Sequence, residues 1–245
     1  AIDHYAFAYC NLQYVELPLS LQTIDHYAFS YCNALQSVAI PDGVTELGAN
    51  IFRESLNLRS VVFGRNIKKM GNYSFIGCSS IDTITILASE PPTTKDLSLN
   101  VDSCLLRVFK SSYSAYVKHA YWSKFSNIST LNTIHLDVNN AEWGIVLGAG
   151  YYDTNTDVVI MAQAVEGYEF AGWLDANGFV LEAEDWESMV ATGDSENNTM
   201  IFIAKWEKIS NNVVEYYEDR SSTKPFESHY FDDGELVQYP TMTVY

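Results

Sequence analysis

The 245-residue sequence has few basic side chains. It contains 14 Lys and Arg residues against 31 Asp and Glu residues, a formal net charge of −17 at pH 7. Because proteins that bind nucleic acid neutralise phosphates with Lys and Arg, this composition argues against a nucleic-acid partner. The excess of acid lies in residues 131–245, which hold 21 acidic and four basic residues, while residues 1–130 hold ten of each. Such a change in net charge along the chain predicts at least two units with different surfaces.

Long apolar runs are missing as well. No run approaches the roughly 18 residues of a membrane-spanning helix, so we expect no membrane insertion. No charged segment followed by a short apolar one marks a signal peptide in this chain, although a processed signal would leave no trace. Charged residues make up only 18% and hydrophobic residues 47%, which excludes wholesale disorder and predicts a substantial core.

The sequence also lacks the motifs of common catalytic sites. No His-Glu-x-x-His, Walker loop or Gly-x-Ser-x-Gly segment occurs, so we expect no catalytic residues, no cofactor and no metal. The four cysteines lack the paired spacing of a zinc site. Cys10, Cys32 and Cys78 recur at one repeat position, which favours small buried core residues over disulfide partners or ligands.

What the sequence has is an internal repeat of 22 or 23 residues. Its clearest series is Phe7, Phe29, Phe52 and Phe75, and four further apolar series keep the same phase. Residues 14–17 alternate between outward and inward positions, which predicts a short strand ended by Pro18, and the same pattern recurs before Pro41. One unit cannot bury its apolar residues alone, so the units are expected to stack.

Residues 2–18 and 24–41 resemble the BspA-type leucine-rich repeats of bacterial surface proteins. The phase of the apolar residues, the closing proline and the Ala-Phe-x-x-Cys element all agree. The third unit departs from this pattern, with Ser55 in place of cysteine and Gly64 in place of proline. The resemblance covers roughly residues 1–90 and implies a leucine-rich-repeat solenoid. Because the chain enters inside a repeat, further repeats or a cap upstream are expected.

The period stops after residue 92, and the next segment predicts a closing element. Residues 104–108 alternate like one more strand, and Ser111 or Ser112 could cap a helix. One face of that helix would carry Tyr113, Tyr116, Val117 and Ala120, with Trp122, Phe125 and Ile128 behind it. The segment is similar to the element that often closes BspA-type arrays, so residues 1–130 are predicted to be a repeat domain with a C-terminal cap helix.

Longer alternating runs follow residue 131. Residues 157–164 and 200–206 predict strands, and residues 175–178 predict a turn. The segment Gly-Tyr-Glu-Phe-Ala-Gly-Trp at residues 167–173 resembles the signature of the Listeria–Bacteroides (internalin B-type) repeat module, a spacer or accessory binding unit of surface proteins. It implies a small β-rich domain at residues 131–208. The fold class is therefore α+β or mainly β.

Residues 209–245 form an acidic C-terminal extension that is rich in aromatics. Disordered tails are poor in aromatic residues, so we expect this one to pack on something. Asp-Asp-Gly at residues 232–234 predicts a hairpin turn.

Outward strand positions of the repeats form the candidate binding site. Two columns lie on the concave sheet face that such solenoids often use for partners: Tyr14, Ser37, Ser60 and Thr83 in one, and Glu16, Ala39, Val62 and Thr85 in the other. These side chains are small, mostly neutral and rich in hydroxyls. A solvated sheet is the plain alternative, and Val62 beside Tyr14 favours a contact surface.

Other candidate sites have simpler explanations. His4 and His26 occupy one repeat position, which favours loop residues over ligands. Residues 153–157 begin like a calcium loop, but Val158 stands where the turn requires glycine. Four tryptophans could line a sugar-binding face: Trp143, Trp173, Trp186 and Trp206. For Trp173 and Trp206, packing in the core is the better interpretation.

The two resemblances together imply a secreted or cell-surface bacterial protein that is non-catalytic. It would mediate protein–protein or cell-adhesion interactions with a macromolecule at the cell surface or in the host matrix. A structural spacer or stalk that displays other domains is one alternative. A carbohydrate-binding accessory module is the other.

Overall fold

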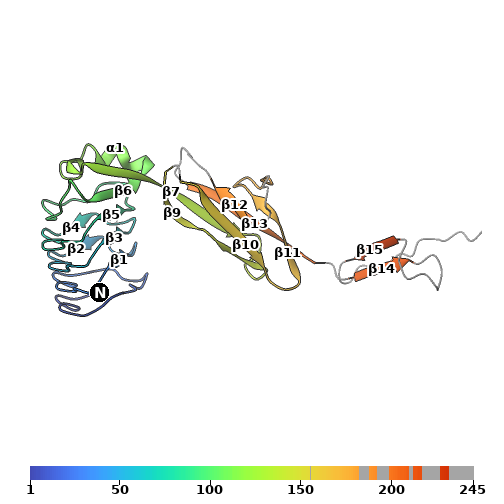
Figure 1. The fold of residues 1–245 in the computed structure, drawn as a ribbon, viewed down its shortest axis with the longest axis horizontal. Helices are drawn as coiled ribbons and strands as arrows, with labels where there is room; N and C mark the ends of the chain where they lie inside the picture. Colours follow the sequence, from blue (N-terminus) through green and yellow to red (C-terminus); the bar gives the residue numbers. More distant parts are fainter. Residues whose placement is uncertain (155, 182–187, 192–198, 210–211, 217–226, 232–245) are drawn as a thin grey trace, which may run out of the picture. The chain divides into compact units, whose positions relative to one another are not determined.

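The computed structural model describes residues 1–154, 156–181, 188–191, 199–209, 212–216 and 227–231. The regular secondary structure of the described part is almost entirely β-strand, with one four-residue α-helix (Figure 1). Two compact units divide the chain. The N-terminal unit comprises Ala1–His135, Ala149–Val158 and Val190–Met200, and the C-terminal unit comprises Leu136–Gly148, Val159–Met189 and Ile201–Tyr245. No helix of the described residues is long and apolar enough to cross a membrane.

A parallel sheet runs through the N-terminal unit, with one strand from each of the second, third and fourth repeats and two from the segment that follows. Its strands, in spatial order, are β1 (Ser37–Ile40), β3 (Ser60–Phe63), β5 (Thr83–Ile86), β6 (Leu105–Phe109) and β7 (Asn127–Val138) (Figure 1). Strand β9 (Gly150–Asp153) pairs antiparallel with β7. Sequential strands are neighbours in space, so every repeat packs on the one before it, as the period predicts.

A second, smaller ladder links the same repeats. Strands β2 (Glu46–Leu47) and β4 (Lys69–Met70) pair in parallel. Isolated bridges extend this ladder in both directions, joining Ile2 to Ile24, Ile24 to Leu47 and Lys69 to Thr93. Each repeat thus has a second point of backbone contact with its neighbour.

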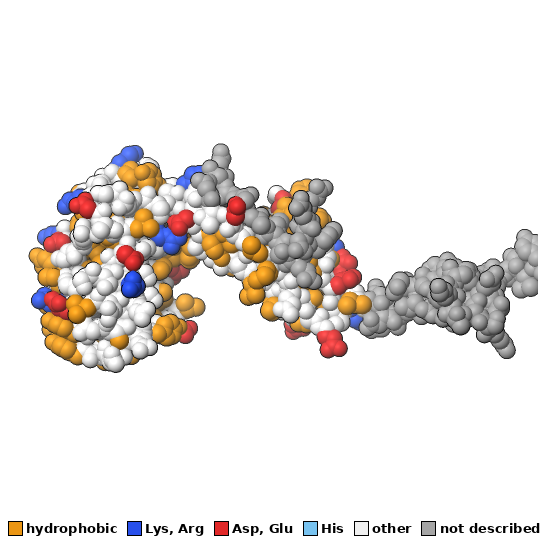
Figure 2. Space-filling model, in the orientation of Figure 1, with side chains coloured by type: hydrophobic (Ala, Val, Ile, Leu, Met, Phe, Trp, Pro, Cys, Tyr) orange, Lys and Arg blue, Asp and Glu red, His pale blue; other side chains and the backbone are white. Residues whose placement is uncertain are grey.

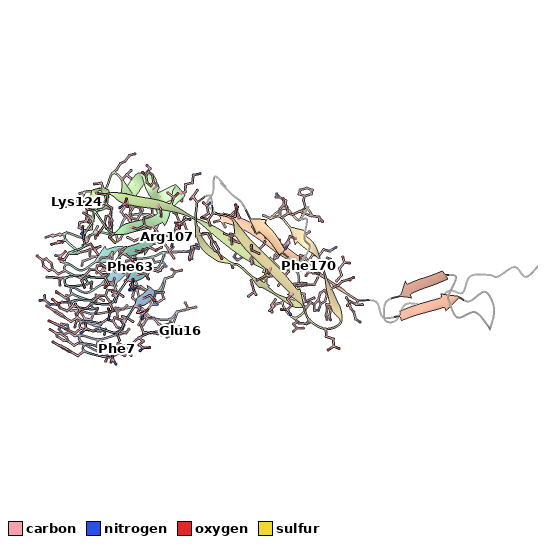
Figure 3. All side chains as sticks on the ribbon, viewed as in Figure 1. Phe7, Glu16, Phe63, Arg107, Lys124 and Phe170 are labelled. Carbon is pink, nitrogen blue, oxygen red and sulfur yellow. The ribbon has the colours of Figure 1, made fainter. Side chains whose placement is uncertain are left out.

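Stacked phenylalanines form the centre of the core. Ring centroids of Phe7 and Phe29 lie 5.3 Å apart, those of Phe29 and Phe52 5.9 Å, and those of Phe52 and Phe75 5.6 Å. The last three of these side chains are buried, whereas Phe7 is partly exposed at the first repeat. Figure 3 labels Phe7 and Phe63 within the stack of repeats. Burial of each ring depends on a neighbour at both sides, which is why one unit could not fold alone.

The cysteines are core residues, and all four are free thiols. The Sγ of Cys32 donates to the carbonyl oxygen of Phe7 at 3.0 Å, and the Sγ of Cys78 donates to that of Phe52 at 2.9 Å. Cys32, Cys78 and Cys104 are buried, and Cys10 is half-buried. Each buried thiol of the repeat position therefore joins one repeat to the preceding one.

The strand expected at residues 14–17 is wrong. No strand is assigned before β1, and Tyr14 and Glu16 are exposed. Val15 and Leu17 are only half-buried. Burial of one face is what holds a strand in register, and here that burial is incomplete.

The cap helix is much shorter than expected. The described segment has a 3₁₀ turn η1 (Lys110–Ser112), one helical turn α1 (Tyr113–Tyr116) and a second 3₁₀ turn η2 (Trp122–Lys124). Ser112 makes no side-chain capping bond. Buried aromatics tie the segment to the last repeat instead: the Tyr116 hydroxyl donates to the Ala88 carbonyl oxygen at 3.1 Å and the Trp122 indole to that of Pro92 at 2.8 Å. These bonds fix the chain path more strongly than helix propensity does.

The strands of the C-terminal unit form three groups. Strands β12 (Ser188–Ala191), β10 (Val158–Ala164) and β8 (Gly144–Leu147) lie side by side in that order. Strand β11 (Tyr168–Leu174) pairs antiparallel with β13 (Thr199–Lys208), and β14 (Asn212–Tyr216) pairs antiparallel with β15 (Glu227–Phe231). The strands predicted at 157–164 and 200–206 are confirmed as β10 and β13.

Two tryptophans form the core of this unit. Trp173 and Trp206 are each 1% exposed, and the Phe170 ring packs edge-on at 5.5 Å from both. The predicted turn at residues 175–178 is confirmed: the Asp175 carboxylate accepts the backbone N–H groups of Asn177 at 2.8 Å and Phe179 at 2.9 Å. Trp186 and the hairpin turn predicted at residues 232–234 lie outside the described residues.

Candidate interaction surface on the repeat sheet

The parallel sheet brings six of the eight predicted site residues together. Register pairs Ser37 with Ser60 and Ser60 with Thr83, and it pairs Ala39 with Val62 and Val62 with Thr85. Inward residues between them are buried, so the two columns stand on the opposite, outward face.

Exposure of the columns falls from β1 towards β5. Ser37 and Ala39 on β1 are exposed, Ser60 and Val62 on β3 are half-buried, and Thr85 on β5 is only 5% exposed. Arg107 on β6 lies next to Thr85 in the register. The open part of the face therefore lies on β1 and β3.

Tyr14 and Glu16 do not join these columns. They belong to the segment that forms no strand, and the Tyr14 hydroxyl donates to the Glu16 carboxylate at 3.3 Å. The Glu16 charge is the main cause that raises the pKa of Tyr14. Figure 3 shows Glu16 projecting from the same side of the unit as Arg107. Tyr14 and Glu16 therefore extend the face as part of an exposed loop that is not paired with a strand.

Charged residues cross the face at β6 and β7. The Arg107 guanidinium holds both oxygens of the Asp153 carboxylate, with Nε at 3.0 Å from Oδ1 and Nη2 at 2.9 Å from Oδ2. The Ser129 hydroxyl donates to Asp153 Oδ1 at 3.2 Å. Because Asp153 lies on β9, these bonds join β6, β7 and β9 on one surface.

Arg65 stands beside this group with two aromatic rings. Its Nη2 donates to the Tyr151 hydroxyl at 3.2 Å, and its guanidinium carbon lies 5.8 Å from the Phe109 ring centroid and 5.7 Å from that of Tyr151. The two rings meet edge-on at 5.7 Å. Sequence reasoning missed this cluster because Tyr151 and Phe109 belong to no repeat series. The only indication in the sequence was that Gly64, directly before Arg65, stands where the first two repeats have a proline.

A row of four surface tyrosines was also missed, of which Tyr5 and Tyr9 are exposed and Tyr27 and Tyr31 are half-buried. Tyr5 stacks on Tyr27 with centroids 4.7 Å apart, and Tyr9 stacks on Tyr31 at 4.5 Å. All four residues have positive φ angles between 58° and 62°, which residues other than glycine rarely adopt. Because the rings cover each other's faces, they present edges and hydroxyls to solvent.

The predicted minor sites have structural roles where they are described. The His26 ring accepts the backbone N–H of Ala49 at 2.9 Å, so it links two repeats. Trp143 stacks on Tyr168 at 4.9 Å. In the calcium-like segment Asp153 is paired with Arg107, and Asn155 lies outside the described residues. Among the described residues no three His, Cys, Asp or Glu side chains are grouped to hold a metal ion.

Charges are mixed over the N-terminal unit. Figure 2 shows acidic and basic side chains interspersed on the face that it draws, without a patch of one sign. This agrees with the balance of ten acidic and ten basic residues in residues 1–130. The face drawn therefore offers no patch of one sign for long-range electrostatic attraction.

Comparison with known families agrees with the two halves of the chain. Residues 1–99 match the BspA type leucine rich repeat region (6 copies), and residues 134–210 match the divergent InlB B-repeat domain. Neither the curated proteins nor the solved structures contain a match to the chain. The chain thus has a region similar to BspA-type leucine-rich repeats followed by a region similar to the divergent InlB B-repeat domain, in the order predicted from its sequence.

Proposed function

We propose that this chain is a non-catalytic adhesion protein of a bacterium, secreted or held on the outer face of the cell. The two families together indicate a surface module for protein–protein interaction. In this proposal residues 1–130 form a solenoid repeat domain with its C-terminal cap. Residues 131–208 form a β-module, and residues 209–245 form an extension.

The open part of the sheet face is the observation that carries the proposal. Ser37, Ala39, Ser60 and Val62 form a patch of small, uncharged side chains on two adjacent strands. Interface centres are depleted of charged residues, and such a patch can be desolvated at little cost. The Arg107–Asp153 pair and the loop with Tyr14 and Glu16 would form a polar rim. The partner is a protein or another macromolecule at the cell surface or in the host matrix.

Charge insertion on the open face tests this proposal. The double variant Ser60→Glu/Val62→Glu places two carboxylates at the centre of the patch, where a partner would have to desolvate them. We expect it to abolish binding to cultured epithelial cells or to surfaces coated with purified matrix proteins, with unchanged thermal unfolding. Leu56→Glu, at an exposed position off the sheet, is the matched control and should bind like the parent.

The main alternative is a structural spacer that holds other domains away from the cell. It predicts that neither variant changes any binding assay, so the same experiment separates the two functions. A carbohydrate-binding accessory role would instead appear as retention on immobilised glycans that survives Ser60→Glu/Val62→Glu.

A further inference from the structure

A pocket of about 370 Å³ opens at the carboxyl ends of three parallel strands of the N-terminal unit. Arg65 and Asn66 follow β3, Ser89 follows β5, and Phe109 ends β6, with Ser111 and Ser112 directly behind it. Loops after successive parallel strands converge at one edge, which makes such an edge a common place for ligands. The volume suits a ligand of one small ring, at the lower end of the range for small-molecule sites.

The pocket contains one fixed cation and no acid. Arg65 is held by its hydrogen bond to the Tyr151 hydroxyl at 3.2 Å and lies against the Phe109 ring. Among the described residues no carboxylate lies within the 4.0 Å ion-pair distance of its guanidinium. None of the described lining residues is acidic. In a chain with a net charge of −17, this pocket has a formal charge of +1.

Nearby acids are occupied elsewhere. The Asp42 carboxylate accepts the backbone N–H of Arg65 at 2.6 Å, so it orients the main chain of the loop. Asp153 is held by both nitrogens of Arg107. Apart from the Nη2 bond to Tyr151, the guanidinium of Arg65 therefore keeps its donors for a ligand, and its planar fork suits a carboxylate.

Hydroxyl and amide groups surround this cation. Ser89 and Ser111 are exposed at the rim, and Asn66 is fixed by donating to the Asp42 carbonyl oxygen at 2.9 Å. Ser112 is 3% exposed, and its Oγ has no hydrogen-bond partner among the described residues. Buried hydroxyls are normally paired, so an oxygen-rich ligand at this wall would complete the site.

We propose that this pocket binds an acidic sugar. The carboxylate would pair with Arg65, the sugar hydroxyls would bond to Asn66 and the serines, and the apolar face of the ring would lie on Phe109. This assignment does not depend on the proposed function, because the pocket lies at the edge of the sheet and not on the columns of β1 and β3.

The test is titration of the full chain with glucuronate, glucose and sulfate, followed by calorimetry or by chemical shifts of the amides near Arg65. Glucuronate should bind, and glucose, which has the same ring without the carboxylate, should bind about tenfold more weakly or worse. Arg65→Gln should weaken the binding of glucuronate by a similar factor. Arg59→Gln, an exposed arginine outside the pocket, should leave binding unchanged.

A second variant keeps the test decisive if Arg65→Gln does not fold. Ser111→Leu fills the rim of the pocket at an exposed position and leaves the charge of Arg65 in place. It should also weaken the binding of glucuronate. Absence of glucuronate binding to the parent chain overturns the proposal. Equal binding of sulfate and glucuronate overturns it too, since the site would then hold a bare anion. Loss of glucuronate binding with unchanged adhesion in Arg65→Gln would leave the adhesion proposal intact.

Discussion

The Ser55 hydroxyl donates to the carbonyl oxygen of Phe29 in the preceding repeat, at 2.9 Å. Cys32 and Cys78, at the same repeat position, make the equivalent bond to Phe7 and Phe52. Serine thus replaces cysteine without loss of the link between repeats, and it adds one bond, because its Oγ accepts the backbone N–H of Cys32 at 3.2 Å. The position selects a small side chain with a donor, not a thiol as such.

Removing that hydroxyl should therefore destabilise the array. Ser55→Ala leaves the buried Phe29 carbonyl and the Cys32 N–H without these partners, which we expect to cost about 1–3 kcal/mol of unfolding free energy. Ser55→Cys keeps a donor and should lose less. Urea denaturation measures both variants, with Ser103→Ala at an exposed position as the control. Equal stability of Ser55→Ala and the parent would contradict the role of this bond.

The buried thiols should be protected from thiol reagents in the folded chain, and their ionisation at alkaline pH should destabilise the fold. Burial raises the pKa of Cys32 to about 11 and the pKa values of Cys78 and Cys104 to about 12. At pH 8 a thiol reagent should react with the half-buried Cys10 in the folded chain and with all four cysteines in urea. Rapid reaction of four thiols in the native protein would show that the core is open.

The same pKa values set the direction of the pH dependence. Because folding raises these pKa values, the folded state favours the protonated thiols. That contribution is complete below the unfolded pKa near 8.5 and is lost as pH rises towards 11 to 12. The urea midpoint should thus fall above pH 9. Cys78→Ser should flatten this fall, whereas Cys10→Ser should have less effect.

The pair of Arg107 and Asp153 should contribute a small, salt-dependent energy. The two side chains are 26% and 47% exposed, so solvent screens their interaction. A double-mutant cycle with Arg107→Gln and Asp153→Asn should give a coupling free energy of about 0.5–1 kcal/mol at low salt. It should shrink in 1 M salt, where the screening length falls to about 3 Å. Additive single effects at low salt would show that the contact is not maintained in solution.

Gly144 should tolerate no larger residue. A Cβ at this position would lie 2.5 Å from Cζ2 of Trp206 and 2.8 Å from the carbonyl oxygen of Gln163. Trp206 is buried and cannot retreat without disturbing the core. Gly144→Ala should cost about 1–3 kcal/mol of unfolding free energy in urea titrations. Ala141→Val, at an exposed position nearby, should stay close to the parent.

Periodic burial is what the sequence predicts well. The phenylalanine series and the stacking of the repeats follow from residue spacing, since a buried position in one repeat is buried in the next. Tyr14 and Glu16 depart from this pattern, because the apolar side chains beside them are only half-buried and no strand forms there. The cap segment shows the same limit. Tyr116 and Trp122 were expected in the core, while the single helical turn depends on their bonds to Ala88 and Pro92.

The sequence by itself determined the repeat, the balanced charge of residues 1–130 and the outward positions on β1 and β3, because these depend on periodicity and composition alone. Only the tertiary structure decided that Arg107 binds Asp153 across 46 residues and that Arg65 meets Tyr151 across 86. Such contacts join residues of different repeats, or of a repeat and β9. No local period relates them, so only the path of the folded chain brings their side chains within hydrogen-bonding distance.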